Sequence, residues 1–283
     1  MKTHPVPILL LLHSIPILCG NILGVFIFPS ISHQSVFQSI WKELSLRGHN
    51  VTVVTPDPLN DPSLINLTEI SIRFTYDFLK QTTMQDLMSK DSNVFQGIDT
   101  TSRFMDGVVE AELNSTGFKD LIDNQSNYFN LILIENFHPI MYALAERFRA
   151  PVIGISAFGA LALHHNIVGN PTHPVLYPDL LFGFYNIDVS MWKKIKSVLW
   201  SLFSRHYYHG DLVPRVHNTA KKYFEENLPY LGDLERAQSM LFLNVNPLLY
   251  PLRPNVPAVV DMGQMHIRPV KPIPEVSTIN TTL

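Results

Sequence analysis

A histidine and a glutamate in this chain follow two apolar runs that have the length of buried β-strands. His33 comes shortly after the run 22–28, and Glu135 comes directly after the run 131–134. A carboxylate bonded to one ring nitrogen of a histidine fixes the tautomer and stabilises the imidazolium that forms when the other nitrogen takes a proton. Such a pair can remove the proton of a hydroxyl group, and this assistance typically raises a rate by about 10²- to 10⁴-fold.

The segments around these two residues alternate between strand and helix patterns. Strands are expected at 22–28, 51–55, 70–74, 131–134, 151–155 and 239–245, and helices at 36–47, 140–148, 191–203 and 212–227, with Gly48 at the end of the first helix. This alternation predicts an α/β fold, a Rossmann-like doubly wound parallel sheet with right-handed crossovers. If the strand order is 3-2-1-4-5, ligands bind where the winding reverses, between the first and fourth strands. His33 and Glu135 then lie at the same crevice.

The pairing has alternatives in the sequence. A histidine after a strand is often only a helix-cap or loop residue, and Glu135 could instead pair with Arg147 or Arg149. By position alone, Ser30, Gln34 and Phe137 are the candidates for contacts with the molecule that carries the hydroxyl.

Other chemistries have weaker support. Ser30 and Ser32 lie near the histidine, but the chain has no Gly-x-Ser-x-Gly elbow. The histidines at 164–165 and 206–209 lack a carboxylate helix that would complete a metal site, so no metal is expected. Without a Gly-x-Gly-x-x-Gly motif, no dinucleotide cofactor is expected either.

The composition indicates a protein with a large core. Of 283 residues, 46% are hydrophobic and 16% charged, which argues against disorder. The net charge of -3 and the lack of a basic block argue against nucleic acid as a partner. Residues 21–246 are expected to form one domain, and the proline-rich range 247–283 to be a linker and tail.

Residues 1–20 have the pattern of a signal peptide, with Lys2 before an apolar stretch too short to span a membrane. The only cysteine, Cys19, lies within it. Five Asn-x-Ser/Thr sequons follow, and glycans are expected at Asn66, Asn114 and Asn124. These features predict the lumen of the endoplasmic reticulum, or secretion.

The range 191–208 carries an apolar stripe at helical spacing with lysines beside it. One interpretation is a helix on a membrane surface, which would give the chain a peripheral membrane contact. The other is a helix that faces the core while its lysines extend to water. The second interpretation is the more common one, and we expect it here.

Several segments, in order, resemble the N-terminal half of the UDP-glycosyltransferases, particularly those of insects. They are LGVFIFPSISHQ (23–34), LSLRGHNVTVVTP (44–56), FNLILIE (129–135), RFRAPVIGIS (147–156) and NVPAVVDMGQMHI (255–267). The resemblance implies one half of a GT-B fold that binds a small lipophilic acceptor. It also implies His33 as the base, with Glu135 where the family usually has an aspartate, and inverting transfer of a hexose from a UDP-sugar without a metal.

The family's donor-binding motifs, among them Trp-x-Pro-Gln and His-x-Gly-x-x-Ser, do not occur in this sequence. UDP-sugar is therefore expected as a partner only of a complete form. The alternative function is a truncated, inactive form that binds lipophiles or regulates full-length relatives as a hetero-oligomer. A third reading is an unrelated secreted α/β binding domain.

Overall fold

The computed structural model describes residues 19–81, 94–182, 190–246, 248, 250 and 253–267. In that part of the chain, seven strands form one parallel sheet in the order β3-β2-β1-β4-β5-β6-β7. The strands are β1 Asn21–Val25, β2 Asn50–Thr55, β3 Leu67–Ser71, β4 Leu131–Glu135, β5 Val152–Ser156, β6 Met240–Leu243 and β7 Val259–Asp261. The predicted Rossmann-like doubly wound fold is confirmed, and the winding reverses between β1 and β4 as expected.

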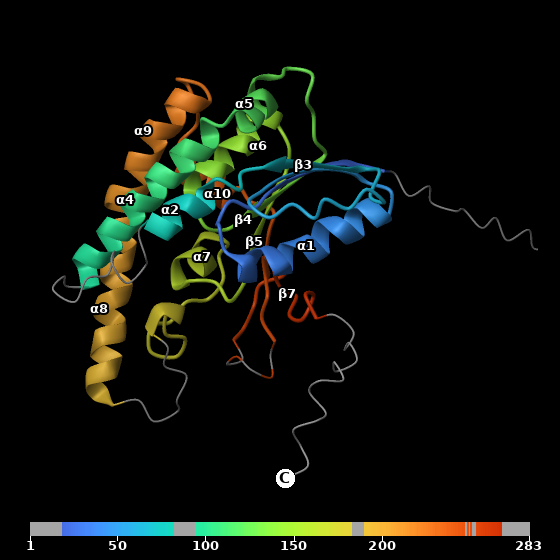
Figure 1. The fold of residues 1–283 in the computed structure, drawn as a ribbon. Coiled ribbons are helices and arrows are strands. Elements are labelled where there is room, and N and C mark those ends of the chain that lie inside the picture. The colour runs from blue at the N-terminus through green and yellow to red at the C-terminus, as the bar shows by residue number, and fades with distance from the viewer. Residues whose placement is uncertain are drawn as a thin grey trace, which may run out of the picture.

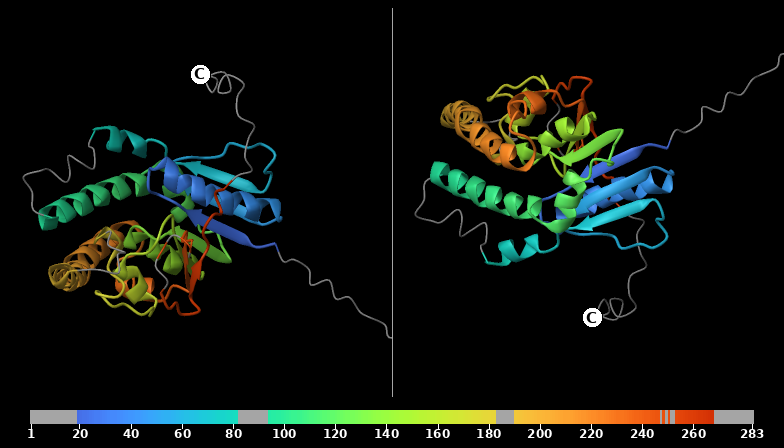
Figure 2. Two further views of the ribbon diagram at one scale, coloured as in Figure 1. Left: turned by 90° about the horizontal axis from the view of Figure 1, so that it is seen from below. Right: turned by 90° about the horizontal axis from the view of Figure 1, so that it is seen from above.

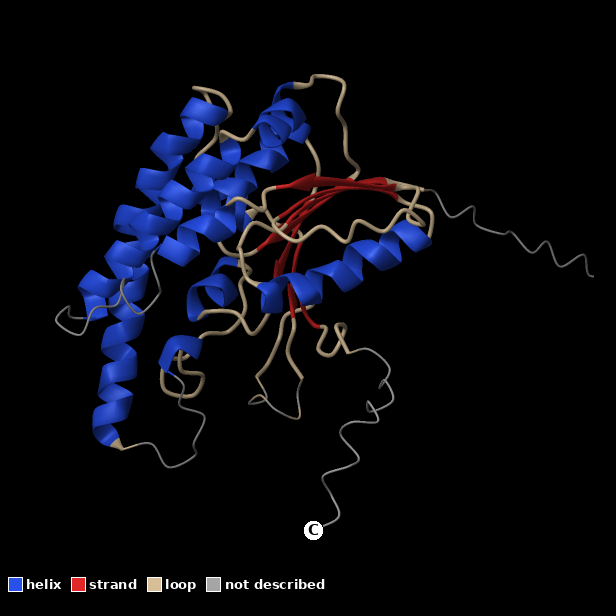
Figure 3. Cartoon of the chain, viewed as in Figure 1, coloured by secondary structure: helices blue, strands red, loops and turns tan. Residues whose placement is uncertain are grey.

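Helices cover both faces of this sheet (Figure 1). They are α1 Ile31–Leu46, α2 Thr75–Gln81, α4 Val94–Leu113, α5 Thr116–Asp123, the 3-10 helix η1 Pro139–Tyr142, α6 Ala143–Phe148, α7 Ala162–Ile167, the 3-10 helix η2 Leu180–Phe182, α8 Met191–Tyr207, the π-helix η3 Tyr208–Leu212, α9 Val213–Tyr223 and α10 Leu231–Arg236. Helix α1 lies on one face, and α4, α8 and α9 stand beyond the carboxyl ends of the strands (Figures 2 and 3).

Successive side chains along β1 point to opposite faces of the sheet, so they contribute to two separate hydrophobic clusters. Phe26, just after β1, is fully buried and stacks on Phe37 of α1, with the ring centroids 4.5 Å apart. Leu23 and Val25 point to the opposite face and pack with residues of α4, α5, η1, α6, α9 and α10. Because β1 is buried on both faces, its sequence is a continuous apolar run, as is typical of central parallel strands.

Helix α1 ends where the sequence predicts. Gly48 has a φ of +91°, a left-handed conformation that costs little only for glycine, and its N–H bonds to the carbonyl of Ser45. The chain then turns directly into β2.

Two sequence expectations need correction. The third strand covers Leu67–Ser71 rather than 70–74, because it is a half-exposed edge strand whose polar residues mask its start. The range expected to be only linker contains β7, which pairs with β6 through Leu241 and Val259. Asn170 holds this segment from the α7 side, since its side-chain oxygen accepts a hydrogen bond from the N–H of Val256 at 2.7 Å.

Several expectations concern residues outside the described ranges, namely most of the signal peptide and the tail from 268. Of the sequons expected to carry glycans, Asn114 and Asn124 are exposed and Asn66 is half-buried. The Nδ2 of Asn114 donates to the hydroxyl of Tyr223 at 2.8 Å, whereas the side chain of Asn124 bonds to other described residues only through its Oδ1, within a local turn. Among the described helices, none is long and apolar enough to cross a membrane.

Candidate active site

His33 and Glu135 meet at the point where the winding of the sheet reverses. The Nδ1 of His33 lies 2.8 Å from Oε1 of Glu135, although the two residues are 102 positions apart in sequence. The second carboxylate oxygen accepts a hydrogen bond from the N–H of Phe28, also at 2.8 Å. The carboxylate is therefore held at two points, and the ring is held by the carboxylate.

The elements explain this meeting. Glu135 is the last residue of β4, and β4 pairs with β1 through Val25 and Ile134. The chain leaves β1 through Phe28 and enters α1, whose first turn contains His33. Because β1 and β4 are neighbours and parallel, both of these connections lie at the carboxyl edge of the sheet, as expected for this topology.

Burial and the helix end set the electrostatics of the pair. The side chain of Glu135 is 3% exposed and that of His33 is 16% exposed. The N-terminus of a helix carries a partial positive charge, which disfavours a positively charged ring in the first turn. Glu135 supplies the opposite charge, so the pair can accept a proton at Nε2, a nitrogen with no hydrogen-bond partner among the described residues.

Aromatic side chains surround the ring of His33. The centroid of Phe28 lies 4.8 Å from that of His33, the centroid of Phe158 lies 5.4 Å away, and Phe137 packs on Phe28 at 4.5 Å. All three phenylalanines are half-buried. Of the three, only Phe137 is among the residues predicted from the sequence. Phe28 and Phe158 follow the ends of strands, β1 and β5, so the same topological rule could have identified them.

The structure gives Gln34 a different place from the one expected. Its side chain is fully buried, and its Nε2 donates to the carbonyls of Phe26 and Phe28 at 3.2 and 2.9 Å. Its Oε1 accepts a hydrogen bond from the hydroxyl of Thr55 at 2.8 Å. Gln34 therefore ties the ends of β1 and β2 together beneath the site, and it presents no surface to an acceptor.

Ser30 lies at the N-terminus of α1 and is half-buried, with its hydroxyl 3.0 Å from that of Ser32. It makes no side-chain cap to the helix. Ser30 and His33 thus occupy the same turn, and Ser30 stays a candidate for contact with a ligand.

Among the described residues, neither rival partner of Glu135 forms an ion pair with it. The guanidinium of Arg147 donates to the carbonyl of Ile122 at 2.6 Å and to that of Asn124 at 3.2 Å. Arg149 ends α6 in a left-handed conformation, with a φ of 49°. In the described part of the chain, no group of three His, Cys, Asp or Glu side chains is placed to hold a metal ion.

A second buried carboxyl group, that of Glu112, lies close enough to Glu135 for the two to repel each other when both are charged. Glu112 of α4 is fully buried, and neither of its carboxylate oxygens has a hydrogen-bond partner among the described residues. Burial raises the pKa of Glu112 well above its ordinary value of 4.5, and the charge of Glu135 raises this pKa further. Burial therefore favours the neutral form of Glu112.

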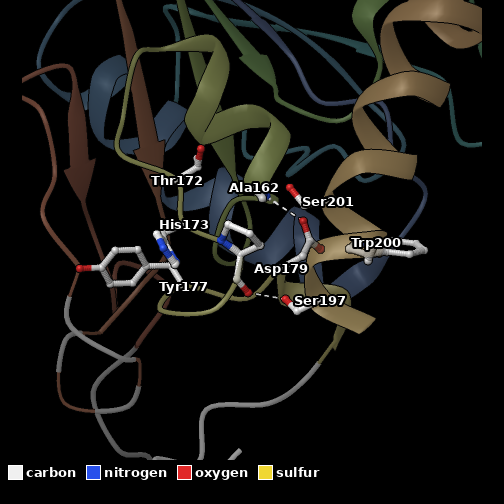
Figure 4. A pocket seen from close by; sticks show the side chains of 9 residues that line it. Ala162, Thr172, His173, Tyr177, Asp179, Ser197, Trp200 and Ser201 are labelled. Atoms are coloured by element: carbon white, nitrogen blue, oxygen red, sulfur yellow. Dashed lines mark hydrogen bonds between the residues drawn. The ribbon is translucent and has the colours of Figure 1, made fainter. Parts of the chain in front are cut away.

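A small pocket lies elsewhere, between α8, the start of α7 and the loop that precedes η2 (Figure 4). Its lining residues are Ala162, Thr172, His173, Pro174, Tyr177, Asp179, Ser197, Trp200 and Ser201. Asp179 is buried there and accepts hydrogen bonds from the N–H groups of Ala162 and Leu181 at 2.8 and 3.0 Å. These bonds satisfy the carboxylate within the fold, and neither His33 nor Glu135 lines this pocket.

Comparison with known proteins finds similar sequences that are named as glycosyltransferases. UDP-glycosyltransferase UGT4 of Dactylopius coccus is 28% identical over 271 residues, which is 92% of this chain and 51% of the relative. UDP-glucosyltransferase 2 of the same organism is 26% identical, covering 90% of this chain and 49% of the relative. The ecdysteroid UDP-glucosyltransferase of Lacanobia oleracea granulosis virus is 27% identical, covering 77% and 53%. The chain thus spans about half the length of the curated relatives it matches.

The model of one protein family matches residues 24–279, which include both members of the His33–Glu135 pair. The match therefore covers nearly all of the sheet and, apart from Leu23, every segment on which the sequence resemblance rests. By this match the chain belongs to the UDP-glucoronosyl and UDP-glucosyl transferase family.

Proposed function

We propose that this chain is the acceptor-binding half of a UDP-glycosyltransferase that moves a hexose from a UDP-sugar to a small lipophilic hydroxyl compound. The single observation that carries the proposal is the 2.8 Å contact between His33 and Glu135 at the reversal of the sheet. In this proposal the domain covers 21–246 and the strand β7, forms one half of a GT-B fold, and leads through the residues after β7 towards a donor-binding half.

In the proposed reaction, Nε2 of His33 takes the proton of the acceptor hydroxyl. The oxygen forms a bond to the anomeric carbon of the sugar while the bond from that carbon to the UDP oxygen breaks, with inversion. Glu135 stays ionised and stabilises the imidazolium. The carboxylate of Glu135, 2.8 Å away, compensates the positive charge that develops on the ring of His33. Without it, this charge would stand unpaired beside the partial positive charge of the helix N-terminus.

The acceptor class follows from the surroundings of the base. Phe28, Phe137 and Phe158 present aromatic surface beside the imidazole, which suits an apolar molecule with one hydroxyl. Several viral relatives are named ecdysteroid UDP-glucosyltransferases, so a hydroxylated steroid belongs in the acceptor panel beside simple phenols.

The setting of the enzyme is part of the same proposal. A signal peptide at 1–20 would direct the chain to the lumen of the endoplasmic reticulum. Of the three sequons expected to carry glycans, Asn124 is the best placed, because it is exposed and its Nδ2 makes no bond to another described residue. At Asn114 a glycan would replace the bond to Tyr223.

The test is a transfer assay with labelled UDP-sugars on the chain itself and on the chain fused to the donor half of the UGT4 relative. We expect transfer to phenols or steroids by the fusion, and its loss on His33→Ala. His209→Ala is the matched control, since this histidine is exposed and lies on η3. Full activity of the His33→Ala fusion would refute the role of the base.

The alternative function, a binding or regulatory partner, makes a different prediction in the same experiment. The chain alone would bind a lipophilic acceptor, and would lower the turnover of a full-length relative without any transfer of its own. Calorimetry with UDP tests where the donor site lies. We expect the fusion to bind UDP and the chain alone not to bind it.

A further inference from the structure

The apolar stripe of α8 does not face the core. The prediction that it faces the core is wrong, because Met191, Trp192, Leu199 and Leu202 are 60–73% exposed, and Ile195 and Val198 are 40% and 37% exposed. The side chains that α8 buries are Ser197 and Trp200, on the opposite side. The helix thus directs most of its apolar residues away from the protein.

The exposed residues form one continuous surface. At about 100° per residue, the six side chains fall within an arc of roughly one third of the helix circumference. Phe203 borders this arc and packs on Phe95 of α4 with the ring centroids 4.3 Å apart, and Phe95 is itself 52% exposed. Large contiguous apolar patches on a protein surface mark interaction sites. We call the six α8 residues together with Phe95 the α8 patch.

Charge indicates what this patch meets. Helix α8 contains three lysines and an arginine but no aspartate or glutamate, in a chain whose net charge is -3. At the same angular spacing, Lys194 and Lys196 flank the apolar arc on its two sides. Long cationic side chains beside an apolar face can extend towards anionic head groups while the face is buried among acyl chains.

The position of α8 allows such contact. It runs along the outer edge of the molecule, and its N-terminal half extends beyond the other elements drawn in colour (Figure 1). A second copy of the chain fits less well, because two α8 helices packed through this face would bring their cations together without an acid on α8 to pair with them.

We propose that the α8 patch binds the surface of an anionic lipid bilayer, with α8 lying in the plane of the interface. The apolar arc enters the boundary between head groups and acyl chains, and the flanking lysines contact lipid phosphates and carboxylates. This contact is separate from the chemistry at His33, and it holds whether or not the chain transfers sugars.

The experiment uses flotation with phosphatidylcholine vesicles and with vesicles that also contain phosphatidylserine. Of the three tryptophans, Trp41 and Trp200 are buried and Trp192 is 73% exposed. Trp192 fluorescence therefore reports contact, through a blue shift and through quenching by brominated lipid. The variant Trp192→Phe keeps the apolar surface but removes the signal. All proteins keep residues 1–20, so that this apolar stretch contributes equally.

We expect co-flotation with the phosphatidylserine vesicles, weakened by salt, and quenching that is lost in Trp192→Phe. Leu199→Ser with Leu202→Ser should lower the partition coefficient by more than tenfold, because each buried leucine contributes roughly a factor of ten or more. Lys194→Glu with Lys196→Glu should remove the preference for phosphatidylserine. Leu46→Ser with Ile65→Ser, at exposed sites on α1 and in the loop before β3, is the matched control and should bind as the parent does.

Two results would overturn the proposal. One is equal flotation of the parent and the Leu199→Ser, Leu202→Ser variant, with both shown to be folded by circular dichroism and thermal unfolding. The other is self-association of the parent in sedimentation without vesicles, lost in that variant, together with no quenching by brominated lipid. The second result would assign the α8 patch to a protein interface.

Discussion

Replacing Glu135 by glutamine tests the pair without a change in size. The carboxylate accepts two hydrogen bonds at 2.8 Å, from the N–H of Phe28 and from His33. A glutamine has one oxygen and one NH₂ group. If the oxygen stays with Phe28, the NH₂ faces Nδ1 of His33, and this nitrogen must become an acceptor. The ring proton then moves to Nε2, the nitrogen that has to take the proton of the acceptor.

The expected effects on rate and stability differ in size. A ring held in the wrong tautomer loses activity by about 10⁴-fold in comparable carboxylate–histidine pairs. Two charge-assisted hydrogen bonds become neutral ones, which lowers the free energy of unfolding by about 2 kcal/mol in total. The neutral amide also avoids the cost of burying a carboxylate, which is several kcal/mol and acts in the opposite direction. The net change in the free energy of unfolding should therefore stay within about 2 kcal/mol.

Three measurements check this. Turnover is measured on the fusion, the free energy of unfolding by urea titration, and the tautomer of His33 by ¹⁵N chemical shifts of the imidazole. Glu135→Asp is the matched control, since it keeps the charge and shortens the side chain by one methylene. The reasoning is refuted if Glu135→Gln keeps turnover within tenfold of the parent, or if the proton of His33 stays on Nδ1.

The remaining predictions concern the supports of the site. Gln34→Met should lower the free energy of unfolding by about 3 kcal/mol, because the buried hydroxyl of Thr55 loses its acceptor and the carbonyl of Phe26 loses the side-chain donor, whereas the carbonyl of Phe28 keeps the N–H of Ser30. A loss below 1 kcal/mol in urea unfolding would contradict the role given to Gln34. Glu112→Met should stabilise the protein at pH 7. The folded-state pKa of Glu112 is raised, so the parent loses stability as pH rises from about 4.5, where the unfolded chain begins to ionise, towards the folded-state pKa. The gain in the variant should therefore increase with pH over that window, and a gain that is independent of pH would contradict it.

Much of the fold can be derived from the sequence. The run from Ile22 to Phe28 is continuous in its apolar character because a central parallel strand is buried on both faces, and Gly48 marks a helix end because of its left-handed backbone. The edge strand β3 and the strand β7 were missed or displaced. Both lie at the margins of the sheet, where half the surface faces water and the apolar pattern is weak.

Only the tertiary structure separates residues of similar appearance at the site. Ser30 and Gln34 are equally polar and lie in neighbouring turns, but Gln34 is sealed among Phe26, Phe28 and Thr55 while Ser30 stays half-exposed. The spacing of apolar residues along a helix likewise does not show whether the apolar side faces the core or the solvent. Helix α8 has the spacing of a core helix, and its neighbours α4, α7 and η3 leave its apolar side uncovered.

The sequence by itself determined that a histidine follows one strand of a parallel sheet and an acid ends another, because strand length, the alternation of strands with helices and the right hand of the crossovers together specify a topology. The contact between them, the aromatic residues around them and the outward face of α8 were decided only by tertiary structure. These depend on the register and packing of segments more than a hundred residues apart, such as Phe28 and Glu135, which no local pattern encodes.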